Sequence, residues 1–220
     1  MARNSHMGNE NFRLVTRSDF DGLVCAVLLK EVGIIDDILF VHPEDMQDGK
    51  VEISSTDITT NLPYLATAHL VFDHHLSETV RNVVRADNHI NDPDAPSTAR
   101  VVYDHYGGAE RFPTSWEGMM EAVDKGDAAQ FNREQILHPS GWPLLNLLMD
   151  ASTGLGRFHE FRISNYHLVM ELIEKYRTLS LDEIIALPDV QERVTLFFSY
   201  TKPKQKSKSL AARTSMTTWR

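Results

Sequence analysis

Short apolar runs alternate with longer apolar stretches over the first half of the chain. The runs at residues 12–16, 38–41, 51–54 and 70–72 lack polar alternation, which is typical of strands buried on both faces of a parallel sheet. Residues 22–32 are apolar almost all round and end at Gly33, which predicts a buried helix with a glycine cap. Residues 61–67 suggest a short helix, with Pro63 in its first turn. The pattern predicts an α/β fold with an open, mostly parallel sheet flanked by helices.

The second half of the chain shows helical periodicity. Ser97 precedes an apolar-periodic stretch as an N-cap would, so a helix is expected over residues 98–106, ended by Gly107 and Gly108. A further helix is expected over residues 116–123. From about residue 141 the apolar positions recur at helical spacing, and the expected segments are 166–179, 181–187 and 190–198. The α/β sheet is therefore expected to be followed by a helical C-terminal segment.

These elements divide the chain into four parts. Residues 1–10 form a tag-like or disordered leader, since they contain Ser-His-Met. Residues 11–135 form a metal-binding α/β domain, and residues 136–200 form the helical segment. Residues 201–220 are polar and basic without apolar periodicity, and we expect a disordered tail.

Composition narrows the class of protein. The 220 residues are 42% hydrophobic and 24% charged, as in ordinary globular proteins. No apolar run approaches the roughly 20 residues that a membrane helix needs, so no membrane partner is expected. The single cysteine, Cys25, lies in an apolar stretch, which predicts a buried structural thiol and favours a reducing, cytoplasmic compartment.

The net charge of −9 is unevenly distributed. Residues 202–220 hold six basic and no acidic side chains, so the first 201 residues carry 16 basic and 31 acidic ones, a net charge of −15. Such an acidic body disfavours binding of long double-stranded nucleic acid through a basic face. A small phosphorylated substrate or a short oligonucleotide, drawn to bound metal ions, remains compatible with it.

Acidic and imidazole side chains follow several of the predicted strands. Asp19 and Asp21 follow the first, Asp57 the third, and the sequence Asp73-His74-His75 the fourth, while Asp124 lies farther on, three residues before Asp127. Ligands of open parallel sheets bind at the carboxyl ends of the strands. Converging carboxylates would repel one another without cations. Carboxylates with one or two imidazoles suit Mn²⁺ or Mg²⁺, and two such ions about 4 Å apart can activate water for phosphoester or phosphoanhydride hydrolysis.

The ordered set Asp19-Phe20-Asp21-Gly22, Asp57, Asp73-His74-His75 and Asp124 resembles the DHH phosphoesterase superfamily, in particular its exopolyphosphatase-like and nano-RNA phosphodiesterase-like branch. The resemblance covers residue 12 to about residue 135. It implies a two-metal phosphoesterase acting on an oligonucleotide, a cyclic dinucleotide, polyphosphate or a nucleotide bisphosphate, with two Mn²⁺ ions expected and Mg²⁺ as the alternative.

The resemblance also implies a role for each site residue. The metal ligands would be Asp19, Asp21, Asp57, His74 and Asp124, with Asp57 bridging the two ions. Asp73 would orient His74, His75 would contact the scissile phosphate, and Ser97 would add a phosphate contact at a helix N-terminus. Asp127 is left open between a second ligand and a helix cap.

Two features depart from the family pattern. Arg17 stands where many members carry a metal-binding histidine; it cannot bind metal, but it could bind phosphate. No glycine- and histidine-rich loop follows residue 135, so most of the family's C-terminal substrate-binding domain is expected to be absent. Both features motivate an alternative, a catalytically impaired phosphate- or nucleotide-binding or structural protein. Apolar helix faces that such a domain would cover would then favour a homodimer.

Overall fold

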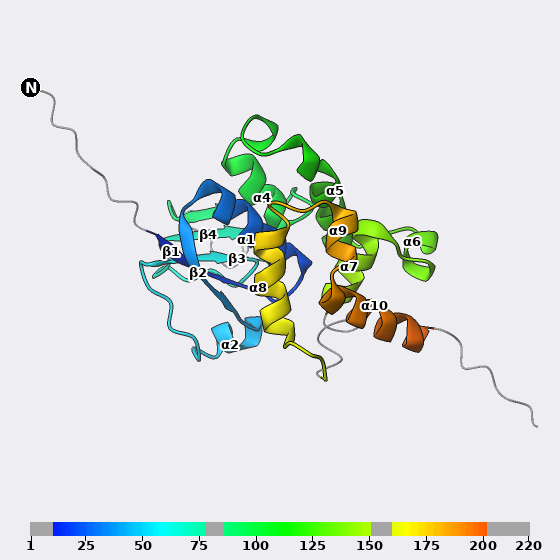
Figure 1. Cartoon of the computed structure of the whole chain (residues 1–220). Coiled ribbons are helices and arrows are strands. Elements are labelled where there is room, and N and C mark those ends of the chain that lie inside the picture. The colour runs from blue at the N-terminus through cyan, green and yellow to red at the C-terminus, as the bar shows by residue number, and fades with distance from the viewer. Residues whose placement is uncertain (1–10, 78–85, 151–159, 202–220) are drawn as a thin grey trace, which may run out of the picture.

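A parallel sheet forms the centre of the computed structural model, which describes residues 11–77, 86–150 and 160–201. Its strand order is β2-β1-β3-β4-β5, and each neighbouring pair runs parallel (Figure 1). The strands are β1 (Phe12–Thr16), β2 (Ile35–Phe40), β3 (Asp57–Thr60), β4 (Leu70–Asp73) and β5 (His89–Asn91). The expected α/β class and parallel sheet are confirmed.

Helices cover the sheet and continue past it. They are α1 (Phe20–Val32), α2 (Pro43–Gln47), α4 (Thr98–His105), α5 (Glu117–Asp127), α6 (Arg133–Leu137), α7 (Gly141–Met149), α8 (Asn165–Lys175), α9 (Leu181–Ile185) and α10 (Pro188–Thr201). The expected helical C-terminal segment is thus present. Within the described parts of the chain, no helix is both long and apolar enough to cross a membrane.

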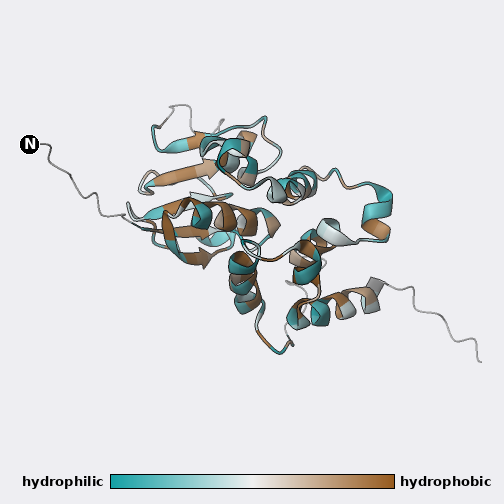
Figure 2. Ribbon diagram, turned by 45° about the horizontal axis from the view of Figure 1, so that its top comes forward, coloured by the Kyte–Doolittle hydropathy of each residue, from teal (hydrophilic) through white to brown (hydrophobic). Residues whose placement is uncertain are grey.

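The core explains why α1 is apolar on nearly every side. This helix packs against β2 and against α4, α5, α7 and α8, so little of its surface meets water (Figure 1). Leu14 and Phe72 belong to the main core that contains α1, whereas their neighbours Val15 and Val71 belong to a smaller cluster. Successive side chains of a strand point to opposite faces, so the sheet is apolar on both faces and its strands are mostly brown in Figure 2.

The helices after residue 135 share this core. A continuous set of buried side chains runs from Leu14 in β1 to Phe197 in α10 and includes residues of α7, α8 and α9. Cys25 is fully buried within it, as expected of a structural thiol. Of these helices, α7 and α8 pack against α1, whose N-terminus carries the acidic motif.

Two of the predicted elements are wrong, and both errors change where the candidate site residues lie. Residues 51–54 are not a strand; the third strand is Asp57–Thr60, and residues 61–67 contain no helix. This polar stretch can form a buried strand because the Thr60 hydroxyl finds a partner inside and donates to Thr16 Oγ1 at 2.7 Å. The prediction also omitted α2 and β5 and started β2 three residues late. The leader and nearly all of the basic tail lie outside the described residues.

Candidate metal centre

The turn from β1 into α1 places two carboxylates at the carboxyl end of the sheet. Asp19 is the N-cap of α1, and its Oδ1 accepts a hydrogen bond from the Gly22 backbone N–H at 2.9 Å. A Cβ atom on Gly22 would lie 2.1 Å from the carbonyl oxygen of Arg17, so only glycine allows this close turn. The other oxygen of Asp19 forms an ion pair with Arg17 Nε at 3.1 Å.

Asp21 is held by the first turn of another helix. Its two oxygens accept hydrogen bonds from the backbone N–H groups of Thr98, at 3.2 Å, and Ala99, at 2.7 Å. These two N–H groups lie in the first turn of α4, where backbone donors have no partner within the helix and a negative charge is favoured. Burial nevertheless raises the pKa of Asp21 well above its usual value, and the nearby carboxylates of Asp127 and Asp19 add to the rise.

His74 follows β4 and is oriented by the backbone. Its Nδ1 lies 3.1 Å from the carbonyl oxygen of Ala95, which can only accept, so Nδ1 carries the proton. Nε2 is then turned toward Asp127 at the end of α5, whose Oδ2 lies 2.8 Å away. The family resemblance implied Asp73 as the residue that orients His74; the structure corrects this, because the Ala95 carbonyl fixes the His74 ring.

Three side chains from distant parts of the chain converge here. One ligand atom from each of Asp21, His74 and Asp127 lies within 4.8 Å of the others. Although Nε2 of His74 is close to Asp127, it is buried and makes no well-aligned hydrogen bond within the described structure. Two ligand atoms that approach closely without a hydrogen-bond alignment are arranged as they would be around a shared cation.

The charges of this group fit a cation. Burial by itself would lower the pKa of His74, but the carboxylates of Asp127 and Asp21 outweigh burial and raise the pKa to about 9. Burial is also the main cause of the raised pKa of Asp19. The raised pKa values mean that this buried cluster holds more negative charge than its surroundings stabilise. A divalent ion would neutralise the excess negative charge.

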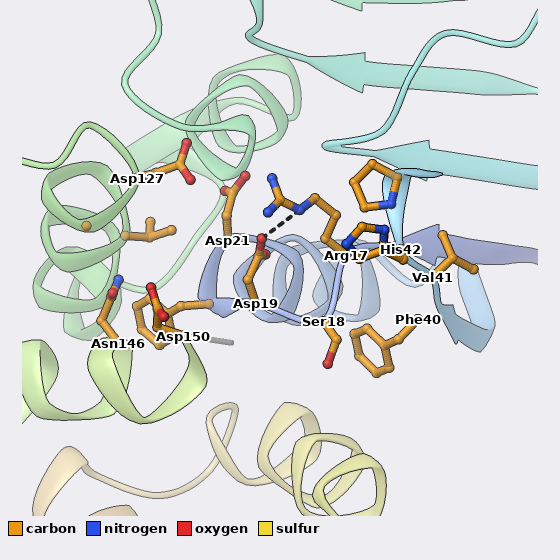
Figure 3. Close-up of a pocket in the computed structure, with 14 residues that line it drawn as sticks. Arg17, Ser18, Asp19, Asp21, Phe40, Val41, His42, Asp127, Asn146 and Asp150 are labelled. Carbon is orange, nitrogen blue, oxygen red and sulfur yellow. Dashed lines mark ion pairs between the residues drawn. The ribbon is translucent and has the colours of Figure 1, made fainter. Parts of the chain in front are cut away.

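A cavity of about 550 Å³ opens beside these residues. Figure 3 shows Asp19, Asp21 and Asp127 around its inner part, with Asn146 and Asp150 of the α7 end on one side and Arg17 and His42 on the other. Gly126 permits this arrangement, because a Cβ atom there would lie 2.0 Å from the side-chain nitrogen of Asn146. The volume is typical of sites for small molecules.

The second imidazole of the motif has its own partner. His75 Nδ1 lies 2.7 Å from Asp73 Oδ1, which also accepts the backbone N–H of His74 at 2.9 Å. Asp73 is only 1% exposed, whereas His75 is partly open to solvent. Asp73 therefore orients His75 rather than His74, in the manner of an outer carboxylate that fixes an imidazole.

Asp57 does not join the group. It is the first residue of β3 and pairs in register with Arg13 near the start of β1, so it lies at the amino end of the sheet, about 10 Å from the carboxyl end of β3. Its carboxylate binds Arg13 Nε at 2.7 Å and the Ser54 backbone N–H at 2.7 Å. The expectation that Asp57 bridges two ions is wrong, because it rested on a strand at residues 51–54.

Asp124 and Ser97 also have structural partners instead of the expected ligands. Asp124 accepts from Arg100 Nε at 3.0 Å and from the Ser97 hydroxyl at 2.8 Å. Ser97 is the predicted N-cap of α4, but it is fully buried, and the N-terminus where it was expected to bind phosphate is occupied by Asp21. Asp127, one helical turn after Asp124, faces the other candidate ligands instead.

One residue near the site had no place in the sequence-based set. Asn61 directly follows β3 at its carboxyl end, is 2% exposed, and lines a second cavity of about 210 Å³ together with Arg17, Asp73 and His75. The β-branched run Ile58-Thr59-Thr60 was the available signal for a strand ending at Asn61. The residue was missed because it was assigned to a helix.

Comparison with known proteins adds a relative of known structure. Neither a protein-family model nor a curated protein matches the chain. Among solved structures, the chain is similar to the pGpG-specific phosphodiesterase PggH from Vibrio cholerae, with 62% sequence identity and a TM-score of 0.79. The match covers 86% of this chain and 60% of the PggH chain, so the chain spans less than two thirds of the length of this relative.

Identity at this level over most of the chain indicates common descent, and it agrees with the motifs read at the turn after β1 and at the exit of β4. The fold is also the one that those motifs implied. In its motifs and in its match to PggH, the chain is similar to phosphoesterases of the DHH superfamily.

Proposed function

We propose that this protein is a metal-dependent phosphodiesterase that hydrolyses a short phosphorylated dinucleotide of the pGpG type. The observation that carries the proposal is the convergence of Asp21, His74 and Asp127 beside a cavity, in a chain 62% identical to a pGpG-specific phosphodiesterase. Of the substrate classes that the motifs left open, this one has the support of a relative.

The donor set favours Mn²⁺ or Mg²⁺ as the cofactor. Two carboxylates and one imidazole are harder ligands than the histidine- and cysteine-rich sets of zinc sites. Asp21, His74 and Asp127 would hold the ion, and the buried Nε2 of His74, which lacks a well-aligned partner in the described structure, would gain one. A bound divalent ion supplies two things here: a water of lowered pKa and positive charge for the phosphate oxygens.

The chain's own residues prepare this site. The Ala95 carbonyl keeps the proton on His74 Nδ1 and leaves the lone pair on Nε2 for the ion. Asp73 accepts the Nδ1 proton of His75 and holds the ring, so that in the imidazolium form Nε2 of His75 can donate a hydrogen bond to a phosphate oxygen. Arg17 lines both cavities and adds a fixed positive charge between them.

The proposed reaction consumes one water per substrate. The water oxygen bonds to the phosphorus of the internal phosphodiester, the bond from phosphorus to the 3′ oxygen breaks, and that oxygen takes up a proton. Hydrolysis of pGpG in this way yields two molecules of the mononucleotide. The cavity of about 550 Å³ is in the range that binds ligands of this size.

The test is hydrolysis of pGpG by the purified chain with Mn²⁺, followed by chromatography of the products. We expect His74→Ala and Asp127→Asn to abolish detectable turnover, because each removes a ligand. Asp124→Asn is the matched control for Asp127→Asn on the same helix, and it should retain turnover since Asp124 faces Ser97 and Arg100. Equal loss in both aspartate variants would contradict this assignment.

A second candidate, a phosphate- or nucleotide-binding protein without turnover, is favoured by one observation. Arg17 pairs with Asp19 at 3.1 Å and so withdraws a carboxylate that could otherwise bind a second ion. If the wild-type chain binds Mn²⁺ and pGpG but yields no mononucleotide, this candidate replaces the first. Calorimetry of Mn²⁺ and of pGpG, run beside the turnover assay, separates the two.

A further inference from the structure

The smaller cavity differs in chemical character from the larger one. The larger is lined by four carboxylates, those of Asp19, Asp21, Asp127 and Asp150. The smaller, about 210 Å³, is lined by Arg17, Asn61, His75 and a single acid, Asp73. That acid is buried and accepts hydrogen bonds from His74 and His75, so its charge is already compensated. What the smaller cavity offers a ligand is mainly hydrogen-bond donors.

Two features of Asn61 are energetically unfavourable at this position. Its side-chain oxygen and nitrogen are buried, and neither has a hydrogen-bond partner within the described parts of the chain. Burial of an amide without hydrogen-bond partners destabilises the folded chain. The backbone is also left-handed, with φ of 55°, a conformation that only glycine adopts freely and that asparagine tolerates better than most residues.

The backbone at Asn61 is fixed despite these costs. Its N–H donates to the Phe72 carbonyl at 3.1 Å, which ties the end of β3 to β4 immediately before Asp73. The side chain is thus held beside the motif that carries both imidazoles. An unsatisfied amide in an uncommon backbone conformation at the edge of a cavity is the mark of a group that acts on a ligand.

Arg17 completes the donor set. A guanidinium has five N–H donors, and the contact with Asp19 uses the one on Nε. Arg17 lines both cavities, so its positive charge lies between the metal cluster and Asn61. A guanidinium and a neutral amide can both donate to phosphate oxygens, whereas a guanidinium cannot bind a metal ion.

We propose that Arg17 and Asn61 form an anion subsite that binds the oxygens of the phosphate group beside a single divalent ion held by Asp21, His74 and Asp127. The guanidinium then takes the place of a second cation, and Asn61 is a substrate-binding residue. This inference rests on the proposed function for the identity of the anion as a phosphodiester. It departs from the expectation of two ions, because one of the expected ligands, Asp57, is at the far end of β3 and another, Asp19, is paired with Arg17.

The experiment is calorimetric titration with Mn²⁺ alone, then with inorganic phosphate on the Mn²⁺-loaded chain. Wild type should bind one Mn²⁺ per chain. Asn61→Gly keeps the left-handed backbone but removes the amide, and Arg17→Gln removes the charge; each should weaken phosphate binding about tenfold while Mn²⁺ affinity is unchanged. Asn61→Asp, of nearly the same shape, should weaken phosphate further because its carboxylate repels the anion. Arg133→Gln, at an exposed position on α6, is the matched control for lost charge and should behave as wild type.

Several results would overturn the proposal. Two Mn²⁺ ions per wild-type chain would remove the need for a guanidinium in place of a cation. A loss of Mn²⁺ affinity in Asn61→Gly would make Asn61 a metal ligand, and unchanged phosphate binding in both Asn61→Asp and Arg17→Gln would make the pair structural. Phosphate binding requires no turnover, so an inactive chain that still shows these differences would contradict the proposed function and leave the anion subsite standing.

Discussion

At the scale of single residues, the partner of a carboxylate decides its role. Asp57 and Asp127 have the same side chain, yet Asp57 is bound by Arg13 and Ser54, and Asp127 faces an imidazole beside a cavity. Burial works against the charged form of Asp57, but the bonds from Arg13 and Ser54 outweigh it and leave its pKa below the usual value. A carboxylate satisfied in this way stabilises the fold and has no need of a metal ion.

Replacement of Asp57 by Asn tests this role. We expect the free energy of unfolding to fall by about 2 kcal/mol, since a charge-assisted bond to Arg13 is lost, and Mn²⁺ affinity to stay unchanged. The folded-state pKa of Asp57 is depressed, so its contribution is fully present above the unfolded pKa of about 3.9 and is lost as the pH falls through the folded-state value. Urea unfolding of wild type and Asp57→Asn between pH 3 and pH 7, about the practical range for the assay, should show the two curves converging at the acid end.

Loss of Mn²⁺ binding in Asp57→Asn, with the fold intact, would return Asp57 to the metal site. Arg13→Gln provides the complementary variant, because it removes the same ion pair from the other strand. It should destabilise the protein to a similar extent and leave Mn²⁺ affinity alone.

The sequence was sufficient for some site residues and not for others. Asp19, Asp21 and His74 follow strands that apolar runs identify correctly, so their shared location could be predicted. The positions of Asp57, Asn61 and Asp124 could not be predicted, because they depend on hydrogen bonds that form only on folding. The bond between Thr60 and Thr16 allows a polar strand to be buried. The bond between Arg100 and Asp124 turns that side of α5 toward α4. Those bonds join residues 24 to 44 positions apart, beyond the reach of local pattern.

At the scale of elements, the N-terminus of α1 determines where the acidic motif lies. The helix is buried on nearly all sides, so its position is fixed by the core and not by the site. Its boundaries were close to those that the apolar run and Gly33 predicted. The turn before it is the sensitive part, because Gly22 approaches the Arg17 carbonyl so closely.

Gly22→Ala should therefore disturb both stability and the site. The added methyl group would overlap the Arg17 carbonyl and approach Thr16 Oγ1, which forces the turn that carries Arg17 and Asp19 to move. We expect a loss of about 1–3 kcal/mol in the free energy of unfolding, as for other overpacked sites, together with weaker phosphate binding. Chemical denaturation and phosphate calorimetry measure the two effects.

The control lies at the other end of the same helix. Gly33→Asn also replaces a glycine, but asparagine tolerates its left-handed conformation, and no atom lies within 4 Å of the added Cβ. It should cost less stability and leave phosphate binding intact. If Gly33→Asn impaired phosphate binding as much as Gly22→Ala, the turn before α1 would have no special role.

At the scale of the whole molecule, the candidate ligands tie together segments that are far apart in sequence. Asp21 belongs to α1, His74 follows β4, and Asp127 ends α5, so the three meet only in the folded chain. A cation that binds all three favours the native state over the unfolded one. The expectations of a homodimer and of a cytoplasmic location remain predictions.

Manganese should accordingly raise the melting temperature. At a free concentration about 100 times Kd the stabilisation is about 2.7 kcal/mol, which corresponds to a shift of about 5–10 °C for a protein of this size. Differential scanning fluorimetry with Mn²⁺, and again after chelation, measures it. His74→Ala should lose the shift and Asp124→Asn should keep it; a full shift in His74→Ala would place the ion elsewhere.

The left-handed backbone of Asn61 has an evolutionary consequence. Glycine, asparagine and aspartate tolerate that conformation best, and the codons of the last two differ by a single base. One point mutation would therefore exchange a neutral donor for a carboxylate beside Arg17 without rebuilding the strand. A single base change therefore separates a pocket that binds phosphate through Arg17 and a neutral amide from one in which a carboxylate repels the phosphate.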